Sequence, residues 1–271
     1  MNENGSLPLK KEIGQLYTLA LIIALLAVIA SIAGLVSPNI IYPTAELRES
    51  FLANDVTTLF IGLPILLASM WLSRRGKLLG LLLLPGALFF MLYNYLVYLL
   101  AMPFNWFYLL YPAIIILSIY GLANLLPKID AQNLKENLEG RVSERFGGGV
   151  LVVLALIFFA RAAGILFNAI TGKLPVPGTE LALNITDALV SPVWVLSGLL
   201  LWRRKAFGYL TGLGMLFQGS MLFIALIVLM LIQPLLTDAT FSIIDIIVVL
   251  LMGMICFVPF ALFWRGLQRK N

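Results

Sequence analysis

A single arginine inside an apolar run is the residue of this sequence best placed to do chemistry. The run "VLALIFFARAAGILFNAI" covers residues 153–170 and reads as a membrane helix except at Arg161. An arginine near the middle of a membrane costs about 2.5–3.5 kcal/mol on insertion scales and rarely faces lipid. Arg161 is therefore expected either to form a structural ion pair, with Asp245 or Asp187 as its partner, or to bind an anion.

Other polar side chains in apolar surroundings are also candidates for a ligand or ion site. Asn94 in "LYNYLVYLL" and Gln218 in a later apolar run carry amides that need hydrogen-bond partners in lipid. They are expected either to bond neighbouring helices or to contact a substrate. Asp55 and Asp187 each stand at the expected start of a helix that carries a repeated proline, Pro64 or Pro192. A carboxylate at such a position either caps the helix or binds a ligand. The tyrosines beside Asn94 are typical of an interfacial aromatic belt.

The residue types that are missing narrow the chemistry further. The chain has no histidine, which excludes His-ligated haem, His-containing zinc sites and Ser-His-Asp triads. Its single cysteine, Cys256, allows no internal disulfide. The sequence also lacks a phosphate-binding loop, a dinucleotide-binding fingerprint and a nucleophile elbow. The sequence therefore assigns no catalytic residue, no metal site and no cofactor.

Composition places the chain among membrane proteins. It is 61% hydrophobic and 11% charged, whereas a soluble domain is about 45–50% apolar and about 25% charged. A spanning helix needs about 20 mostly apolar residues. Eight such runs predict an all-α integral membrane protein with eight transmembrane helices, at 15–37, 58–73, 78–101, 106–126, 149–170, 189–202, 207–232 and 242–264.

The positions of the basic residues predict the orientation of these helices. With a cytoplasmic N-terminus, the inner loops and ends collect fifteen of the 18 lysines and arginines. The outer loops keep only Arg48 and Lys173, as the positive-inside rule requires. Both termini are therefore expected in the cytoplasm, in the plasma membrane of a prokaryote. The basic surplus is a topology signal, so the bilayer is the expected partner and nucleic acid is not.

An internal repeat divides the chain into two halves. The stretch "GLPILLASMWLSRRGKLLG" (62–80) matches "SPVWVLSGLLLWRRKAFG" (191–208), and "YPTAEL" (42–47) matches "VPGTEL" (176–181). The halves are predicted as two parallel four-helix repeats, which enter the membrane from the same side. The expected domains are a cytoplasmic N-terminus (1–12), the first repeat (13–126), a cytoplasmic linker (127–148), the second repeat (149–265) and a cytoplasmic tail (266–271). The linker is expected to contain a short amphipathic helix.

The motifs of both halves resemble a widespread group of uncharacterised bacterial and archaeal multi-span membrane proteins. The first half carries "DVTTLFIGLPILLASMWLSRRGKLLG" followed by "LYNY" (55–95), and the second carries "TDALVSPVWVLSGLLLWRRKAFGYL" (186–210). The resemblance covers most of the chain and implies a fold but no chemistry. Members of the group often carry a lysine in the seventh span, where this chain has Gln218, so no charged site is carried over.

Two further features have a static and a functional interpretation. The segments 38–57 and 171–188 are expected either to fold over the outer mouth as lids or to be ordinary structured loops. Three pairs of small residues have the spacing that lets helices approach closely in lipid. They are Ala30 with Gly34, Ala160 with Gly164, and Gly208 with Gly212. These pairs are expected either to pack statically or to form a sliding interface.

Three functions are compatible with these features. The first is a carrier or binding protein for a small solute or lipid, with a polar site in the outer half of the bundle. Its expected residues are Arg161, Asp245, Asp187, Asn94, Gln218 and Asp55. The alternative is a non-transporting sensor, assembly factor or partner protein in the membrane. The third is an intramembrane enzyme that acts on a lipid head group, for which no pair of carboxylates can be placed by spacing.

Overall fold

The computed structural model describes residues 7–172 and 175–268. Within these residues, eight helical segments are long and apolar enough to cross a membrane, which confirms the predicted number. They are Gly14–Val36 (α1), Ala45–Arg74 (α3, a π-helical turn and α4), Leu78–Ala101 (α5), Trp106–Lys128 (α6 with a short 3₁₀ turn at each end), Glu144–Thr171 (α8), Gly178–Trp202 (α9), Ala206–Leu236 (α10) and Ile243–Gln268 (α11). Two short helices, Pro38–Ile41 (α2) and Ala131–Leu138 (α7), complete the described fold.

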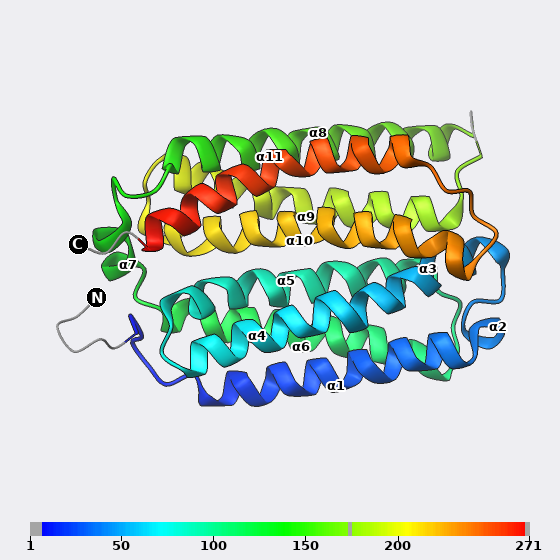
Figure 1. Ribbon diagram of the computed structural model, residues 1–271, viewed down its shortest axis with the longest axis horizontal. Helices are drawn as coiled ribbons and strands as arrows, with labels where there is room; N and C mark the ends of the chain where they lie inside the picture. The colour runs from blue at the N-terminus through cyan, green and yellow to red at the C-terminus, as the bar shows by residue number, and fades with distance from the viewer. Residues whose placement is uncertain (1–6, 173–174, 269–271) are drawn as a thin grey trace.

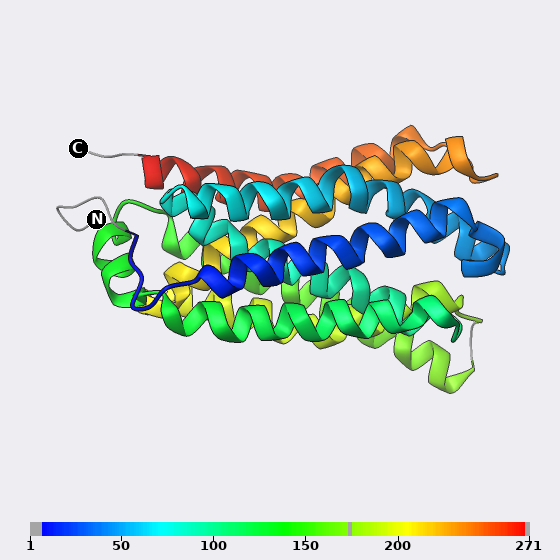
Figure 2. The ribbon, with the colours of Figure 1, turned by 90° about the horizontal axis from the view of Figure 1, so that it is seen from below.

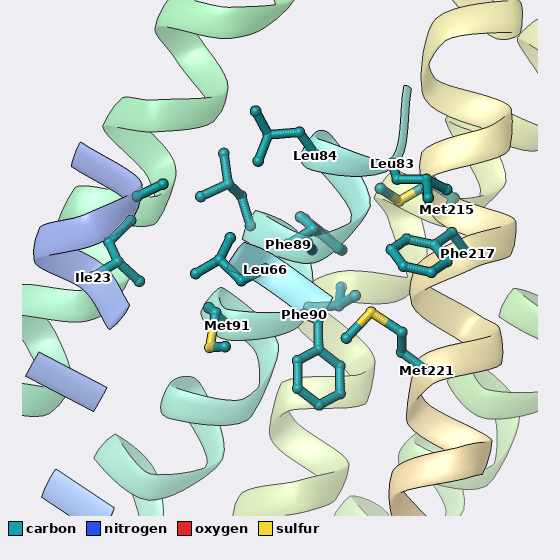
Figure 3. Packing of buried hydrophobic residues seen from close by; sticks show 14 of the residues in the cluster. Ile23, Leu66, Leu83, Leu84, Phe89, Phe90, Met91, Met215, Phe217 and Met221 are labelled. Atoms are coloured by element: carbon teal, nitrogen blue, oxygen red, sulfur yellow. The ribbon is translucent and has the colours of Figure 1, made fainter. Parts of the chain in front are cut away.

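The helices form two groups, which Figure 1 shows as a lower and an upper layer. The first group consists of α1, α3 with α4, α5 and α6, and the second consists of α8 to α11. Helix α5 packs against α10 where the groups meet. At this contact Gly86 lies so close to Gly214 that a Cβ on Gly86 would collide with the carbonyl oxygen of Gly214. Figure 3 shows the buried side chains around this contact, including Phe90, Met215 and Met221.

One end of the bundle carries the start of α1, the end of α11 and α7 (Figure 1). We call this the terminal end, and the opposite end, which carries α2, the far end. The end of α4 and the turns after α4 and α9 lie at the terminal end and contain four arginines, Arg74, Arg75, Arg203 and Arg204. Three other basic residues used to predict the orientation, Lys173, Arg269 and Lys270, lie outside the described residues.

The predicted linker contains the expected amphipathic helix. Helix α7 buries Leu134 and Leu138 and contacts α10. The N-terminal segment also packs here, because Lys10 donates its backbone N–H to Lys128 and Asp130 donates its own to Pro8. The apolar face of the linker is therefore covered by the chain itself.

The described parts of the two segments that were expected either as lids or as structured loops are mostly helix, so the expectation of loops is wrong. Helices α2 and α3 occupy most of 38–57, and α9 begins at Gly178 and runs through 178–188. Prolines and polar residues indicated loops, but Pro38 and Pro177 lie at helix starts, where a missing N–H costs nothing. Among the polar residues that follow them, Asp55, Asn184 and Asp187 are buried in the bundle, whereas Glu46 and Glu180 remain exposed.

The expected helix caps at the two repeated aspartates are also wrong, because both stand inside helices. Asp55 lies near the end of α3, and Asp187 stands nine residues after Gly178. The side chain that caps α3 is Thr44, whose Oγ1 accepts the N–H of Leu47 at 3.2 Å. The neighbouring Thr57 and Thr186 donate their hydroxyls to carbonyls of the preceding turn.

Only some of the small-residue pairs pack as predicted. A Cβ on Gly34 would meet Asp55 and the Tyr42 hydroxyl, and one on Gly208 would collide with the backbone of Leu200. Gly164 has no neighbouring atom within 4 Å of such a Cβ, and Ala160 is exposed. The close helix contact predicted at Ala160 and Gly164 is therefore absent within the described residues, where no other helix covers that face of α8.

Candidate functional site

A cavity of about 590 Å³ lies between the two helix groups, toward the far end. Six helices contribute to its wall: α3, α5, α8, α9, α10 and α11. Most of the wall is apolar, and its charged side chains are Arg161, Glu180 and Asp187. Cavities of this size and composition are typical of small-molecule sites.

The cavity brings together Arg161 and Asp187 from neighbouring helices. Arg161 stands ten residues before the far end of α8, a depth of about 15 Å at 1.5 Å per residue. Asp187 stands nine residues from the far end of α9, at a similar depth of about 14 Å. Both charges therefore lie near the middle of the bundle, where the sequence placed Arg161.

The predicted ion pair of Arg161 is absent. Among the described residues, no carboxylate oxygen lies within 4.0 Å of its guanidinium group, and no hydrogen bond holds it. The charges of Arg161 and Asp187 still interact across the cavity. Asp187 is buried, and its Oδ1 accepts the hydroxyl proton of Tyr93 from α5 at 2.7 Å. The arginine therefore keeps its hydrogen-bond donors free.

Asp245, the other expected partner, lies apart from the cavity wall. It is exposed in the first turn of α11, and its N–H donates to Ser242 Oγ at 3.3 Å. The residues of α11 that do line the cavity, Val249 and Met252, are one to two turns further along the helix. The pairing was expected only because both residues lie at a suitable depth in the membrane. Depth does not determine how far a helix tilts away from its neighbours.

Asn94 lines the cavity and also bonds neighbouring helical segments. Its Oδ1 accepts from Asn54 Nδ2 at 3.0 Å, and its Nδ2 donates to Thr58 Oγ1 at 3.1 Å. Thr58 begins the π-helical turn Thr58–Gly62, and such turns are frequent at functional sites. The expected helix–helix hydrogen bonds are confirmed, and Asn54 joins Asn94 in the wall.

Gln218 lies behind the wall. It is fully buried, and its Oε1 accepts the indole N–H of Trp194 at 2.7 Å, while its Nε2 has no partner within the described part of the chain. Trp194 itself lines the cavity. Gln218 therefore orients an aromatic wall residue that sequence reasoning missed, because nothing in the pattern of α9 marks which face is the inner one.

Asp55 belongs to a separate, fully buried cluster in the first helix group. It accepts hydroxyl protons from Tyr42 at 2.5 Å and from Tyr98 at 2.8 Å. The Tyr98 ring packs in turn against Tyr95 at a centroid distance of 5.3 Å. Tyr95 and Tyr98 are thus core residues, and their assignment to an interfacial belt is wrong. Phe51 lines the cavity and packs against Tyr98, so it separates Asp55 from the cavity.

The repeated "TAEL" and "GTEL" motifs touch each other beside the cavity. Glu46 of the first motif accepts, at Oε1, the N–H of Thr179 at 2.8 Å and its hydroxyl proton at 2.7 Å. This contact satisfies a free N–H group in the first turn of α9. The repetition marked both segments in the sequence, but it did not indicate that they meet.

The described residues contain no group of three side chains that could hold a metal ion. Glu180 and Asp187 are two carboxylates on one cavity wall, separated by about 10 Å along α9.

No protein-family model matches the chain, and neither a curated protein nor a solved structure matches it.

Proposed function

We propose that this protein is a carrier or binding protein for a small solute or lipid, which binds in the cavity between the helix groups. The observation that supports this function most directly is the unpaired Arg161 in the cavity wall. Ionisable residues at this depth usually mark substrate pathways or ligand counter-ions.

The two-repeat architecture belongs to the same proposal. Pro64 and Pro192 occupy matching positions 128 residues apart, and so do Gly86 and Gly214. A two-fold axis between two repeats brings equivalent residues together, and Gly86 does contact Gly214. The axis would run along the membrane normal, as in carriers built from parallel repeats. Sliding of the two halves about this glycine contact is the proposed route to alternating access.

The orientation is proposed from the distribution of charges. The arginine-containing turns after α4 and α9 lie at the terminal end, where the positive-inside rule places the cytoplasm. The far end then faces outward, and the cavity lies in the outer half of the bundle. We place the protein in the plasma membrane of a prokaryote.

The alternative of a docking protein has less support. The linker helix α7 offers a partner little apolar surface, because its apolar face is buried against the protein's own α10.

A ligand screen tests the carrier or binding function. Thermal unfolding of the purified full chain is measured with a library of small solutes and lipids. At least one compound is expected to raise the melting temperature, and Arg161→Gln and Asp187→Asn should remove that shift. Arg265→Gln, an exposed arginine near the terminal end of α11, is the control and should keep it. A ligand response that survives both cavity substitutions would show that the site is elsewhere.

A further inference from the structure

We propose that the ligand of this cavity is a zwitterionic phospholipid that carries an ammonium group, with its head group between Arg161 and Asp187 and its acyl chain leaving between α8 and α11. The inference deepens the proposed binding function and rests on it.

The charges in the wall call for a ligand with both signs. Arg161 provides free guanidinium donors, which match phosphate oxygens in a planar fork. Asp187 uses Oδ1 for Tyr93 and keeps Oδ2 as an acceptor for an ammonium group. The two charges lie at similar depth without touching. A head group that carries phosphate and ammonium would satisfy both residues at once, whereas a simple anion would leave Asp187 without a cationic partner.

Glu180 strengthens the preference for a ligand that carries an amine. It stands in the first turn of α9, nearer the far end than Asp187, and lines the same cavity. The wall therefore carries two carboxylates and one guanidinium group. An acidic lipid without an amine would meet this excess of negative charge on its way to Arg161.

The side chains of α8 and α11 beside the cavity are exposed toward the far end. Arg161 is exposed although it stands in the middle of α8. The residues around it in the far half of α8, such as Phe159 and Phe167, are exposed as well. In the far half of α11 the same is true of Ile244, Ile247, Val248 and Leu251.

Helices α8 and α11 separate toward the far end. They overlap in Figure 1, but in Figure 2 α11 follows the upper edge while the far ends of α8 and α9 emerge at the lower edge. Near the terminal end α11 is held close, because Gly266 packs against the backbone of Arg141, just before α8 begins. The cavity residues on these two helices are Phe158 and Arg161 of α8 and Val249 and Met252 of α11.

The lateral opening decides between a lipid and a free zwitterion. A water-soluble solute would enter from the far end and needs no gap toward hydrocarbon. An acyl chain needs an apolar exit at the depth of Arg161, and the exposed apolar faces of α8 and α11 provide it. The bilayer is therefore the source of the ligand.

Four probes separate the contributions of head group and chain. They are lysophosphatidylethanolamine, lysophosphatidic acid of the same chain, monoolein and phosphoethanolamine. Their binding to the full chain in non-ionic detergent is measured by native mass spectrometry and by the shift in melting temperature. Lysophosphatidylethanolamine should bind at least about tenfold more tightly than the other three, since each supplies only part of the interaction.

Substitutions assign the charges to the two residues. Arg161→Gln should weaken lysophosphatidylethanolamine and lysophosphatidic acid alike, whereas Asp187→Asn should weaken only the former. Arg161→Lys, which keeps the charge but loses the fork, should give an intermediate loss and serves if Arg161→Gln does not fold. Equal affinity for both lipids in the native protein, with no discrimination by Asp187→Asn, would overturn the zwitterion assignment.

The opening is tested with a matched pair on α11. Met252→Trp fills the cavity edge and should weaken the two lysolipids, whereas Leu251→Trp, on the exposed face, should not. If phosphoethanolamine binds as tightly as its lysolipid and Met252→Trp has no effect, the ligand is a free zwitterion. If no probe binds but the wider screen finds an Arg161-dependent ligand, only the lipid inference fails. If the screen also finds none, the proposed function fails with it.

Discussion

Arg161 of α8 and Asp187 of α9 face one cavity from neighbouring helices, yet no direct ion pair joins them. Their opposite charges interact only across the space between them. A direct pair would have neutralised both groups and left little for a ligand to bind. Their separation means that each charge can be removed without leaving a broken ion pair behind, so substitutions here report on binding more than on folding.

The hydroxyl of Tyr93 should stabilise the bundle through Asp187. Tyr93→Phe removes the 2.7 Å hydrogen bond to a buried carboxylate. A hydrogen bond to a charged group contributes about 1.5–3 kcal/mol, so we expect a lower melting temperature in detergent. Tyr120→Phe is the control, because that tyrosine is exposed on α6. Equal melting temperatures for the two variants would argue against the hydrogen bond.

The contact between α5 and α10 should tolerate no side chain at Gly86. Gly86→Ala places a Cβ against the carbonyl oxygen of Gly214, and overpacking of this kind costs about 1–3 kcal/mol. The same substitution at Gly164 meets nothing within 4 Å and should be neutral or stabilising by up to about 1 kcal/mol. Thermal unfolding of both variants measures the difference. A stable Gly86→Ala would show that the helices are not in close contact.

Asp55 should matter for stability and not for ligand binding. Asp55→Ala leaves the buried hydroxyls of Tyr42 and Tyr98 without their acceptor, and each unsatisfied group costs about 1–3 kcal/mol. Phe51 separates this cluster from the cavity, so ligand affinity at temperatures where the variant is folded should be unchanged. Asp245→Ala, at an exposed position, should change stability by less than about 0.5 kcal/mol. Loss of ligand affinity in folded Asp55→Ala would place Asp55 in the binding site.

Glu46 should hold the first turn of α9 against the first helix group. Glu46→Ala removes both hydrogen bonds to Thr179, a loss comparable to that of a helix cap, about 1 kcal/mol. Backbone amide exchange should become faster at the start of α9. Glu49→Ala on the same helix should leave it unchanged, because only the backbone oxygen of Glu49 takes part in a hydrogen bond between helices. Unchanged exchange in Glu46→Ala would contradict the capping role.

The helical framework could be predicted from the sequence because lipid requires long apolar runs. The number of spans and the linker helix α7 follow from hydropathy and amphipathic spacing. Arg161 was identifiable for the same reason, since a charge in such a run needs an explanation. Asp187 and Asn94 were placed with it by depth alone, and the structure brings all three to one cavity.

What the sequence could not predict depends on which helix faces which. The motif at Ala160 and Gly164 has the same spacing as that at Ala30 and Gly34, but only the latter has a neighbouring helix. Tyr95 and Tyr98 resemble interfacial residues until α1 and α3 are placed beside them. The depth of Asp245 predicts it as a partner for Arg161, but the tilt of α11 keeps it away from the cavity wall. Each of these outcomes is decided by contacts between distant segments, which local spacing does not encode.

Under the proposed acyl-chain exit between α8 and α11, lipid would complete the cavity. Six helices supply most of its wall, but in a bilayer the remaining side would be closed by the hydrocarbon chains of adjacent lipids. Membrane thickness and acyl-chain order would then change the shape of the cavity directly. Under the proposed function, the affinity for its ligand would vary with the composition of the host membrane, without a separate sensory domain.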